Sequence, residues 1–235
     1  MMSSQDDVFR KDEADRWYAR NKTDLNSQKG NQDGSGDQFP HDVRQLSSWL
    51  EPFRSEIHKI LEIGCCNGIK LQTLCQVLEA SGEGIEPSRL AVADGNERMK
   101  GVPARLTCGT AEKLPFDSGT FDLVYFGFCL YLLDRCSLLQ ALSEADRVLK
   151  TGGFLAMTDF DPGVMHRRPY THRQGVFSYK QDYTKFYTEG GLYYLVSKHS
   201  LSHRRGFFDP AADERISLSL LYKEPDPYPL RDLAP

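Results

Sequence analysis

Residues 59–68 read KILEIGCCNG, a short apolar run that ends in a turn bounded by two glycines. An apolar run of this length closed by glycine indicates a strand buried in a sheet. The next residues, 68–80, place apolar side chains close to the helical period, so a helix should follow the turn directly. A strand that passes through a glycine turn into a helix predicts the first unit of an α/β sheet.

The same alternation continues along the chain. Further strands are expected at 82–87, 102–108, 121–128 and 153–160, and further helices at 88–100, with Ser88 as N-cap, and at 134–153, closed by glycine. Alternating strands and helices favour a doubly wound, mostly parallel sheet. After Asp161 the pattern changes, and the strand-like runs 192–201 and 215–223 have no clear helix between them, so they could pair antiparallel.

Two segments stand outside this alternation and suggest how the chain is divided. Residues 1–39 combine a polar helix over 7–25, carrying Trp17 and Tyr18, with a Gly-, Asn- and Ser-rich loop, which predicts a helical lid on a flexible hinge. Another helix is expected from 40 to 53. We assign 40–235 to one Rossmann-like domain with an insertion on the acceptor side at about 161–190.

Composition narrows the class of protein. The 235 residues carry a net charge of −4, with 40% apolar and 26% charged residues, which does not favour nucleic acid or an anionic membrane as partner. The six cysteines form no CxxC pair, and no cluster has the spacing of metal ligands, so we expect no metal. The polar N-terminus and the absence of a long apolar run predict a cytoplasmic protein.

The glycine turn has three nucleotide-binding interpretations. A dinucleotide fingerprint needs GxGxxG, but Cys66 and Ile69 occupy its second and third glycine positions, and the spacing does not fit a P-loop. The third interpretation, acid-x-Gly-x-x-x-Gly, fits Glu62, Gly64 and Gly68, although an ordinary glycine turn would look the same. A second acid, Glu86, ends the next strand, where ligands of such sheets bind. It is either a ribose ligand or a surface glutamate.

Taken together, five segments resemble a known family. They are LEIGCCNG, GIEPS, GTAEKLPF, FDLVYFGFCLYLLDR and EADRVLKTGGFLAM, in this order between about 58 and 160. Here the chain resembles the class I, seven-stranded methyltransferases of the small-molecule branch. The resemblance implies S-adenosyl-L-methionine as cofactor and a sheet of order 3-2-1-4-5-7-6 with the last strand antiparallel.

The resemblance also implies roles for residues around the cofactor. Gly64, Asn67 and Gly68 would pack the turn beneath its methionine part, Glu62 would help to hold its ammonium, and Glu86 would bind its ribose. The remaining contacts would lie along the adenine and the sulfonium, from Pro87, Thr110, Ala111, Glu112, Phe126 and Gly127. This chain departs from the family at Cys66, where the middle glycine is missing, and at Thr110, where aspartate is common.

The acceptor side rests on weaker patterns. Cationic and tyrosine side chains interleave over 159–187, which suits an anionic small molecule, or else marks a solvated loop. Asp159 and His166 are candidate bases, and Asp161 is a third, although these aspartates fit helix capping or a turn at Asp161-Pro162-Gly163 equally well. Tyr131 stands where related enzymes often carry a histidine near the methyl donor, and it lines the pocket or belongs to the core.

These observations predict a methyltransferase acting on the O or N of a polar small molecule, such as a sugar or a secondary metabolite. Two alternatives stay open. One is a module that binds S-adenosylmethionine without catalysis, and the other is a methyltransferase for protein or RNA, which the acidic chain and the missing NPPY-like motif disfavour. A homodimer is an open possibility for the assembly.

Overall fold

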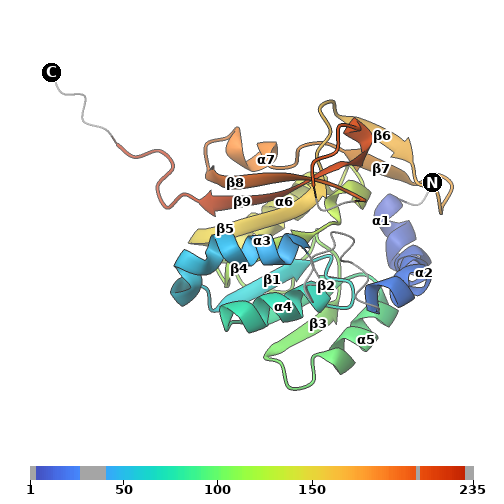
Figure 1. Cartoon of the computed structure of the whole chain (residues 1–235), viewed down its shortest axis with the longest axis horizontal. Helices are drawn as coiled ribbons and strands as arrows, with labels where there is room; N and C mark the ends of the chain where they lie inside the picture. Colours follow the sequence, from blue (N-terminus) through green and yellow to red (C-terminus); the bar gives the residue numbers. More distant parts are fainter. Residues whose placement is uncertain (1–3, 27–40, 205–206, 231–235) are drawn as a thin grey trace.

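The computed structural model of the chain describes residues 4–26, 41–204 and 207–230. Its centre is a seven-stranded sheet in the order β3-β2-β1-β4-β5-β9-β8 (Figure 1). The first five of these strands run parallel, whereas β9 lies antiparallel between β5 and β8. The predicted sheet order and the antiparallel last strand are therefore confirmed. The strands are β1 Lys59–Ile63, β2 Ser81–Glu86, β3 Ala104–Cys108, β4 Phe121–Gly127, β5 Leu149–Phe160, β8 Tyr193–Ser202 and β9 Arg215–Lys223.

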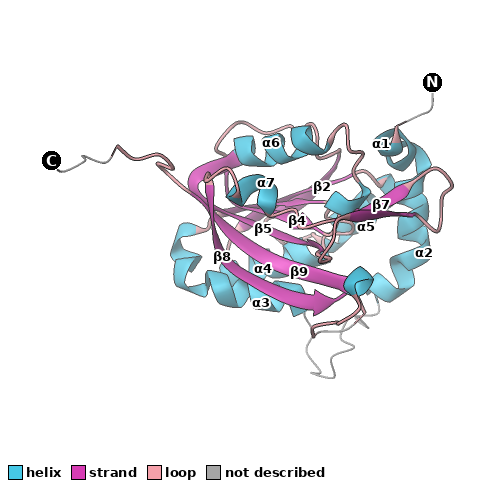
Figure 2. Ribbon diagram, turned by 90° about the horizontal axis from the view of Figure 1, so that it is seen from above, coloured by secondary structure: helices cyan, strands magenta, loops and turns pink. Residues whose placement is uncertain are grey.

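Helices cover both faces of this sheet (Figure 2). One face carries α3 His41–Leu50, α4 Ile69–Leu78 and α5 Arg89–Arg98, and the other carries α6 Leu138–Val148 and α7 Lys185–Thr188. Because both faces are covered, a central strand must be apolar along its whole length. Strand β4, FDLVYFG, meets this requirement except at Asp122, which is buried near the start of the strand and pairs with Lys150.

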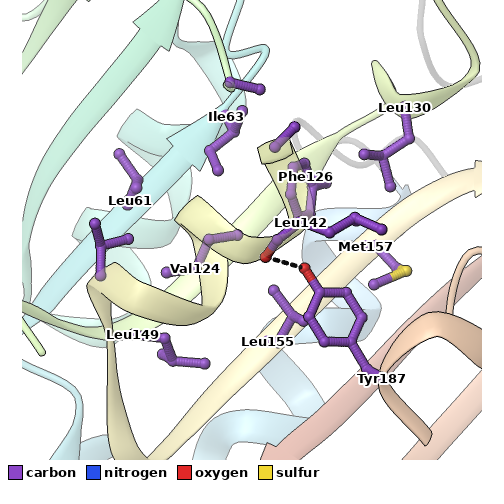
Figure 3. Close-up of a cluster of buried hydrophobic side chains, with 14 of the residues drawn as sticks. Leu61, Ile63, Val124, Phe126, Leu130, Leu142, Leu149, Leu155, Met157 and Tyr187 are labelled. Carbon is purple, nitrogen blue, oxygen red and sulfur yellow. Dashed lines mark hydrogen bonds between the residues drawn. The ribbon is translucent and has the colours of Figure 1, made fainter. Parts of the chain in front are cut away.

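The core beneath α6 shows how the two layers are joined (Figure 3). Leu61, Val124 and Leu155 come from three neighbouring strands and meet the apolar face of α6. Tyr187 of α7 enters the same cluster, and its hydroxyl donates to the Leu142 carbonyl at 2.9 Å. A buried tyrosine hydroxyl needs such a partner, because leaving it unpaired would cost about 1–3 kcal/mol.

Helix ends agree with the sequence at one place and differ at another. Ser88 caps α5 as predicted, since its hydroxyl accepts the Ala91 N–H at 3.0 Å. The prediction that glycine closes α6 is wrong, because the helix ends at Val148 and the chain enters β5 at once. Gly152 and Gly153 instead lie where β5 shifts register against β4. A Cβ on Gly153 would lie 2.9 Å from the Asp122 carbonyl oxygen, so this irregularity requires glycine.

The N-terminal part of the chain is a nearly continuous helix. It comprises α1 Gln5–Val8, a π-helical stretch Phe9–Glu13 and α2 Ala14–Asn26, so it begins two residues before the prediction. It packs beside α5 (Figure 1). The predicted loop lies outside the described residues. None of the described helices is long and apolar enough to cross a membrane.

The insertion contains structure that the sequence pattern did not indicate. Strands β6 His166–Pro169 and β7 Phe177–Lys180 form a separate antiparallel hairpin. Gln5 joins this hairpin to the N-terminal helix, because its side-chain carbonyl accepts the Phe177 N–H at 2.9 Å. Its amide donates to the carbonyls of Phe177 and Leu132, at 2.8 and 2.6 Å.

Candidate functional site

A cavity of about 680 Å³ lies at the carboxyl ends of β1, β2 and β4 and is covered by α1 and α2. This is the switch point of the sheet, where β1 has β2 on one side and β4 on the other. Its volume is typical of a site for a small ligand (about 300–1,000 Å³). Most of the residues predicted for the cofactor line it: Glu62, Gly64, Asn67, Glu86, Pro87, Thr110, Ala111, Glu112 and Gly127.

The turn after β1 needs both of its predicted glycines. Gly64 and Gly68 have φ angles of +73° and +72°, in the left-handed region that favours glycine. A Cβ on Gly64 would lie 2.6 Å from the Cβ of Cys129, and one on Gly68 would lie 2.5 Å from the Met99 methyl. Cys66 also has a positive φ, of +50°, so the cysteine at the middle position adopts a left-handed backbone conformation that favours glycine.

Glu86 is fixed by the backbone of this turn and of the following helix. Its two carboxylate oxygens accept the N–H of Cys66 at 3.0 Å and the N–H of Ser88 at 2.9 Å. Burial raises the pKa of Glu86 to about 7, although both hydrogen bonds oppose the shift. The carboxylate keeps further lone pairs and lies on the cavity wall, so it can accept the two hydroxyls of a ribose.

Glu62 lies under the end of β4 and is almost completely buried. A Cβ on Gly127 would lie 2.5 Å from Oε1 of Glu62, so the glycine leaves room for this carboxylate beside β4. Among the described residues, the other oxygen, Oε2, has no hydrogen-bond partner. Burial raises the pKa of Glu62 to about 8. A buried acid of this kind fits the ammonium of S-adenosylmethionine, since a cation would restore its ionised form.

Two residues predicted at the cofactor lie instead behind the cavity wall. Phe126 is fully buried in the core under α6, because its side chain points away from the turn. Gly68 supports the turn from below, against Met99 and Leu106. Neither contributes to the cavity lining.

Three of the candidates for catalysis are separated by the fold. Tyr131 lines the cavity. Asp159 is buried outside the lining and accepts the N–H groups of Phe160 at 2.8 Å and of Tyr131 at 3.3 Å. Burial raises the pKa of Asp159 to about 7. His166 lies on the β6–β7 hairpin, also outside the lining, with its Nε2 2.7 Å from Asp213.

The cationic segment 161–187, which was expected to bind an anionic acceptor, lies outside the cavity lining. His166 and Arg168 pair with Asp213, and Arg173 lies 3.7 Å from Asp12 on the N-terminal helix. The expectation of a cationic acceptor lid is therefore not supported, because these charges fasten the hairpin to neighbouring segments.

The roof of the cavity comes from the N-terminal helix. One face of α2 contributes residues spaced three and four apart, which is the helical repeat: Ala14, Trp17, Asn21, Asp24 and Leu25. Asp6 and Phe9 extend this face toward the loop after β4. The sequence indicated a lid here, but the individual contacts could not be derived, because they depend on how the helix packs on α5.

Phe128 was also missed by the sequence analysis. It follows β4 with a φ of +72°, which is rare for a residue with a bulky side chain, and it lines the cavity. Its ring lies 5.1 Å from that of Tyr131, and His203 stacks on it at 5.4 Å. Such strain is characteristic of functional sites and persists only where the surrounding packing holds it.

With this geometry established, comparison with known proteins assigns the central part of the chain. Residues 61–157 match the family model described as a methyltransferase domain. This segment is a class I methyltransferase domain. S-adenosyl-L-methionine is the cofactor of this class, and Glu62, Glu86 and the glycine turn fit it.

Similar proteins differ in what they act on. A ubiquinone/menaquinone biosynthesis C-methyltransferase from Rhizobium johnstonii is 33% identical over 124 residues, covering 49% of this chain and 46% of that protein. The matched segment spans less than half the length of the curated relatives that it resembles.

Two solved structures share the fold. The 4+2 cyclase SpnF matches with a TM-score of 0.64 at 18% identity, over 95% of this chain and 97% of the other. A 1,6-didemethyltoxoflavin-N1-methyltransferase from Burkholderia thailandensis, with S-adenosylhomocysteine bound, matches with a TM-score of 0.61 at 12% identity, over 89% of both chains.

Proposed function

We propose that this protein transfers a methyl group from S-adenosylmethionine to a small molecule bound in the roofed cavity. The observation that carries the proposal is the pair of acids at the ends of β1 and β2. Glu86 presents a carboxylate already oriented by two backbone N–H groups, and Glu62 presents a buried acid with one unpartnered oxygen. Both lie on the wall of one cavity in a methyltransferase domain.

The cofactor supplies an electrophilic methyl group on its sulfonium, and the protein has to align an acceptor with it. Tyr131 is the one catalytic candidate among the three that lines the cavity. Burial raises the pKa of its phenol far above the ordinary 10, so the hydroxyl stays protonated and can donate a hydrogen bond but not take a proton. We therefore assign the rate enhancement to alignment and exclusion of water by the roof, without a dedicated base.

Asp159 acts through Tyr131 in this proposal. Its carboxylate accepts the Tyr131 N–H and so holds the turn that carries the phenol at the cavity. It is a positioning residue, since its own side chain is buried behind that turn.

Calorimetry and a transfer assay test the proposal in two steps. S-adenosylhomocysteine should bind to the protein in a 1:1 ratio, and a library of small acceptors incubated with S-adenosylmethionine should yield S-adenosylhomocysteine for at least one member. Failure to bind at about 1 mM, a weak limit for a cofactor site, would exclude the site. Binding without any turnover would instead favour a cofactor-binding module.

A further inference from the structure

The ionisable side chains that line the cavity are predominantly acidic. Its described lining residues include five carboxylates, on α1, α2, β1, β2 and the loop after β3: Asp6, Asp24, Glu62, Glu86 and Glu112. The same lining includes one cation, Lys70, at the start of α4. This imbalance is local, because the whole chain has a net charge of only −4.

The charge of Lys70 is already neutralised. Its ammonium pairs with the carboxylate of Asp42 on α3, and the Tyr125 hydroxyl donates to the same oxygen of Asp42 at 2.8 Å. Lys70 and Tyr125 hold the pKa of Asp42 below its ordinary value, so the pair is ionised. An anion that entered the cavity would compete with Asp42 for this lysine.

Two of the five carboxylates belong to the cofactor under the proposed function, and three remain. Of these, Asp6 accepts the Asp134 N–H at 2.8 Å and a hydrogen bond from the Ser137 hydroxyl. Burial and the nearby carboxylate of Glu112 raise its pKa. Asp6 on the roof and Glu112 after β3 therefore place two acidic side chains close to each other at the cavity.

Apart from the neutral polar residues Asn21, Asn67 and Thr110, the remaining lining is mostly apolar and aromatic. Rings come from the roof and from the loop after β4, and aliphatic side chains lie between them: Phe9, Trp17, Phe128, Tyr131, Leu25, Leu132 and Leu133. Aromatic faces bind planar rings and attract cations, by about 0.5–2 kcal/mol for a cation placed over a ring. They offer no compensation to an anion, and transferring an unpaired carboxylate into such surroundings is strongly unfavourable.

From this distribution we infer that the acceptor is a ring-bearing molecule of zero or positive charge, and that acidic acceptors are rejected by the carboxylates of the roof and floor. The inference rests on the proposed function and adds the class of acceptor. It replaces the anionic acceptor suggested by the sequence, since the cations behind that suggestion lie outside the cavity lining and three of them pair with Asp213 or Asp12.

Matched probes measure the preference directly. For phenyl, naphthyl and indolyl rings, the ethylamine, the ethanol and the acetate derivatives differ mainly in charge. Binding is measured by calorimetry with the protein saturated with S-adenosylhomocysteine, so that a failure of the cofactor site is recognised first and separately. For each ring that binds, the acid should bind at least about tenfold more weakly than the alcohol, and the amine at least as tightly as the alcohol.

A charge added to the roof provides the matched comparison. Asn21 lines the cavity, and its side-chain amide donates to the Trp17 carbonyl of its own helix at 2.8 Å. Thr23, two residues along, is exposed and outside the lining. Asn21→Lys should reduce the disadvantage of the acids to less than about threefold, whereas Thr23→Lys should leave it unchanged.

The inference is overturned if the acids bind as tightly as the alcohols to the unmodified protein. It is also overturned if none of the rings binds while S-adenosylhomocysteine does, because a cavity walled by four aromatic side chains must then serve another class of molecule. Equal effects of the two lysine variants would show that the preference arises from the overall charge and not from the roof.

Discussion

At the scale of single residues, the site depends on acids whose geometry is set by the backbone. Glu86 is the clearest case, because each of its oxygens accepts a backbone N–H, one from Cys66 in the turn after β1 and one from Ser88 at the start of α5. This arrangement removes the freedom of the side chain before a ligand is bound, which lowers the entropic cost of binding.

Replacing Glu86 by glutamine should therefore weaken the binding of S-adenosylhomocysteine. The amide can accept only one of the two N–H bonds and places an NH₂ group against the other donor. The expected loss is roughly 1.5–3 kcal/mol, or about 10- to 150-fold in Kd by calorimetry. Glu83→Gln on the same strand, where the carboxylate pairs with Arg105 at the surface, is the control and should not change Kd. If both variants bind alike, Glu86 is not a ligand.

The sequence predicts Glu62 and Glu86 for a simple physical reason. Parallel strands end at the same edge of a sheet, so acids that close successive strands must come close together. Phe126 and His166 could not be placed in this way. The ring of Phe126 lies on one face of β4. Because this strand is buried on both faces, its apolar residues do not alternate with polar ones, and the sequence does not show which face each ring occupies. The pairing of His166 with Asp213 joins residues far apart in the sequence.

At the scale of elements, the N-terminal helix is the part that closes the site. Asp15 of α2 accepts the Ser88 hydroxyl at 2.7 Å and the Leu90 N–H at 3.0 Å. Ser88 in turn donates its N–H to Glu86. The roof is thus connected by hydrogen bonds to the residue that we assign to the ribose, and α2 also contacts α5 through Tyr18 and Asp94.

Asp15→Ala should loosen this roof. Two hydrogen bonds to a charged acceptor would be lost, at roughly 1.5–3 kcal/mol each at most. Hydrogen exchange of the amides in residues 5–26 should become faster, and S-adenosylhomocysteine should bind more weakly. Arg16→Ala, which removes an exposed ion pair with Asp12, is the control and should leave exchange nearly unchanged. Unaltered exchange in Asp15→Ala would mean that apolar packing alone holds the helix.

Helices and central strands were predictable, whereas the β6–β7 hairpin was not. Its strands, HRRP and FSYK, are only four residues long, and the seven residues between them are not one of the short turns that indicate a hairpin. They are stabilised from outside, by Gln5 and by the ion pairs with Asp213. Because residues distant in the sequence stabilise this hairpin, its own amino-acid pattern does not predict it.

At the scale of the whole molecule, the fold buries three acidic side chains at one end of its sheet. Glu62 and Glu86 lie on the cavity wall and Asp159 lies close behind it, and burial is the main cause of the raised pKa of each. A folded protein that binds protons more tightly than its unfolded chain loses stability as the pH rises. The site is therefore maintained at a cost to stability, and that cost is relieved when a cation binds Glu62.

Glu62→Gln should remove the loss of stability that the buried Glu62 causes as the pH rises. The pKa of Glu62 is about 8 in the folded protein, against an ordinary value of 4.5. Between these values the folded state holds a proton that the unfolded chain has lost, so stability falls by at most about 1.4 kcal/mol per pH unit. Below pH 4.5 both states are protonated and the effect vanishes. Glutamine cannot ionise, so it does not lose stability in this way. Between pH 5 and pH 8 the free energy of unfolding of the variant should therefore rise relative to that of the unmodified protein by up to about 4 kcal/mol.

Urea denaturation at pH 5, 6.5 and 8, without cofactor, measures this difference. Glu97→Gln, at an exposed ion pair with Lys100, should stay within about 0.5 kcal/mol of the unmodified protein at each pH. The same Glu62→Gln variant should bind S-adenosylhomocysteine more weakly at pH 8, because a neutral amide cannot pair with the ammonium. Gained stability together with lost affinity would identify Glu62 as an acid retained for the cofactor. Parallel pH curves for the variant and the unmodified protein would instead show that Glu62 is ionised in the folded state, and that the ammonium is held elsewhere.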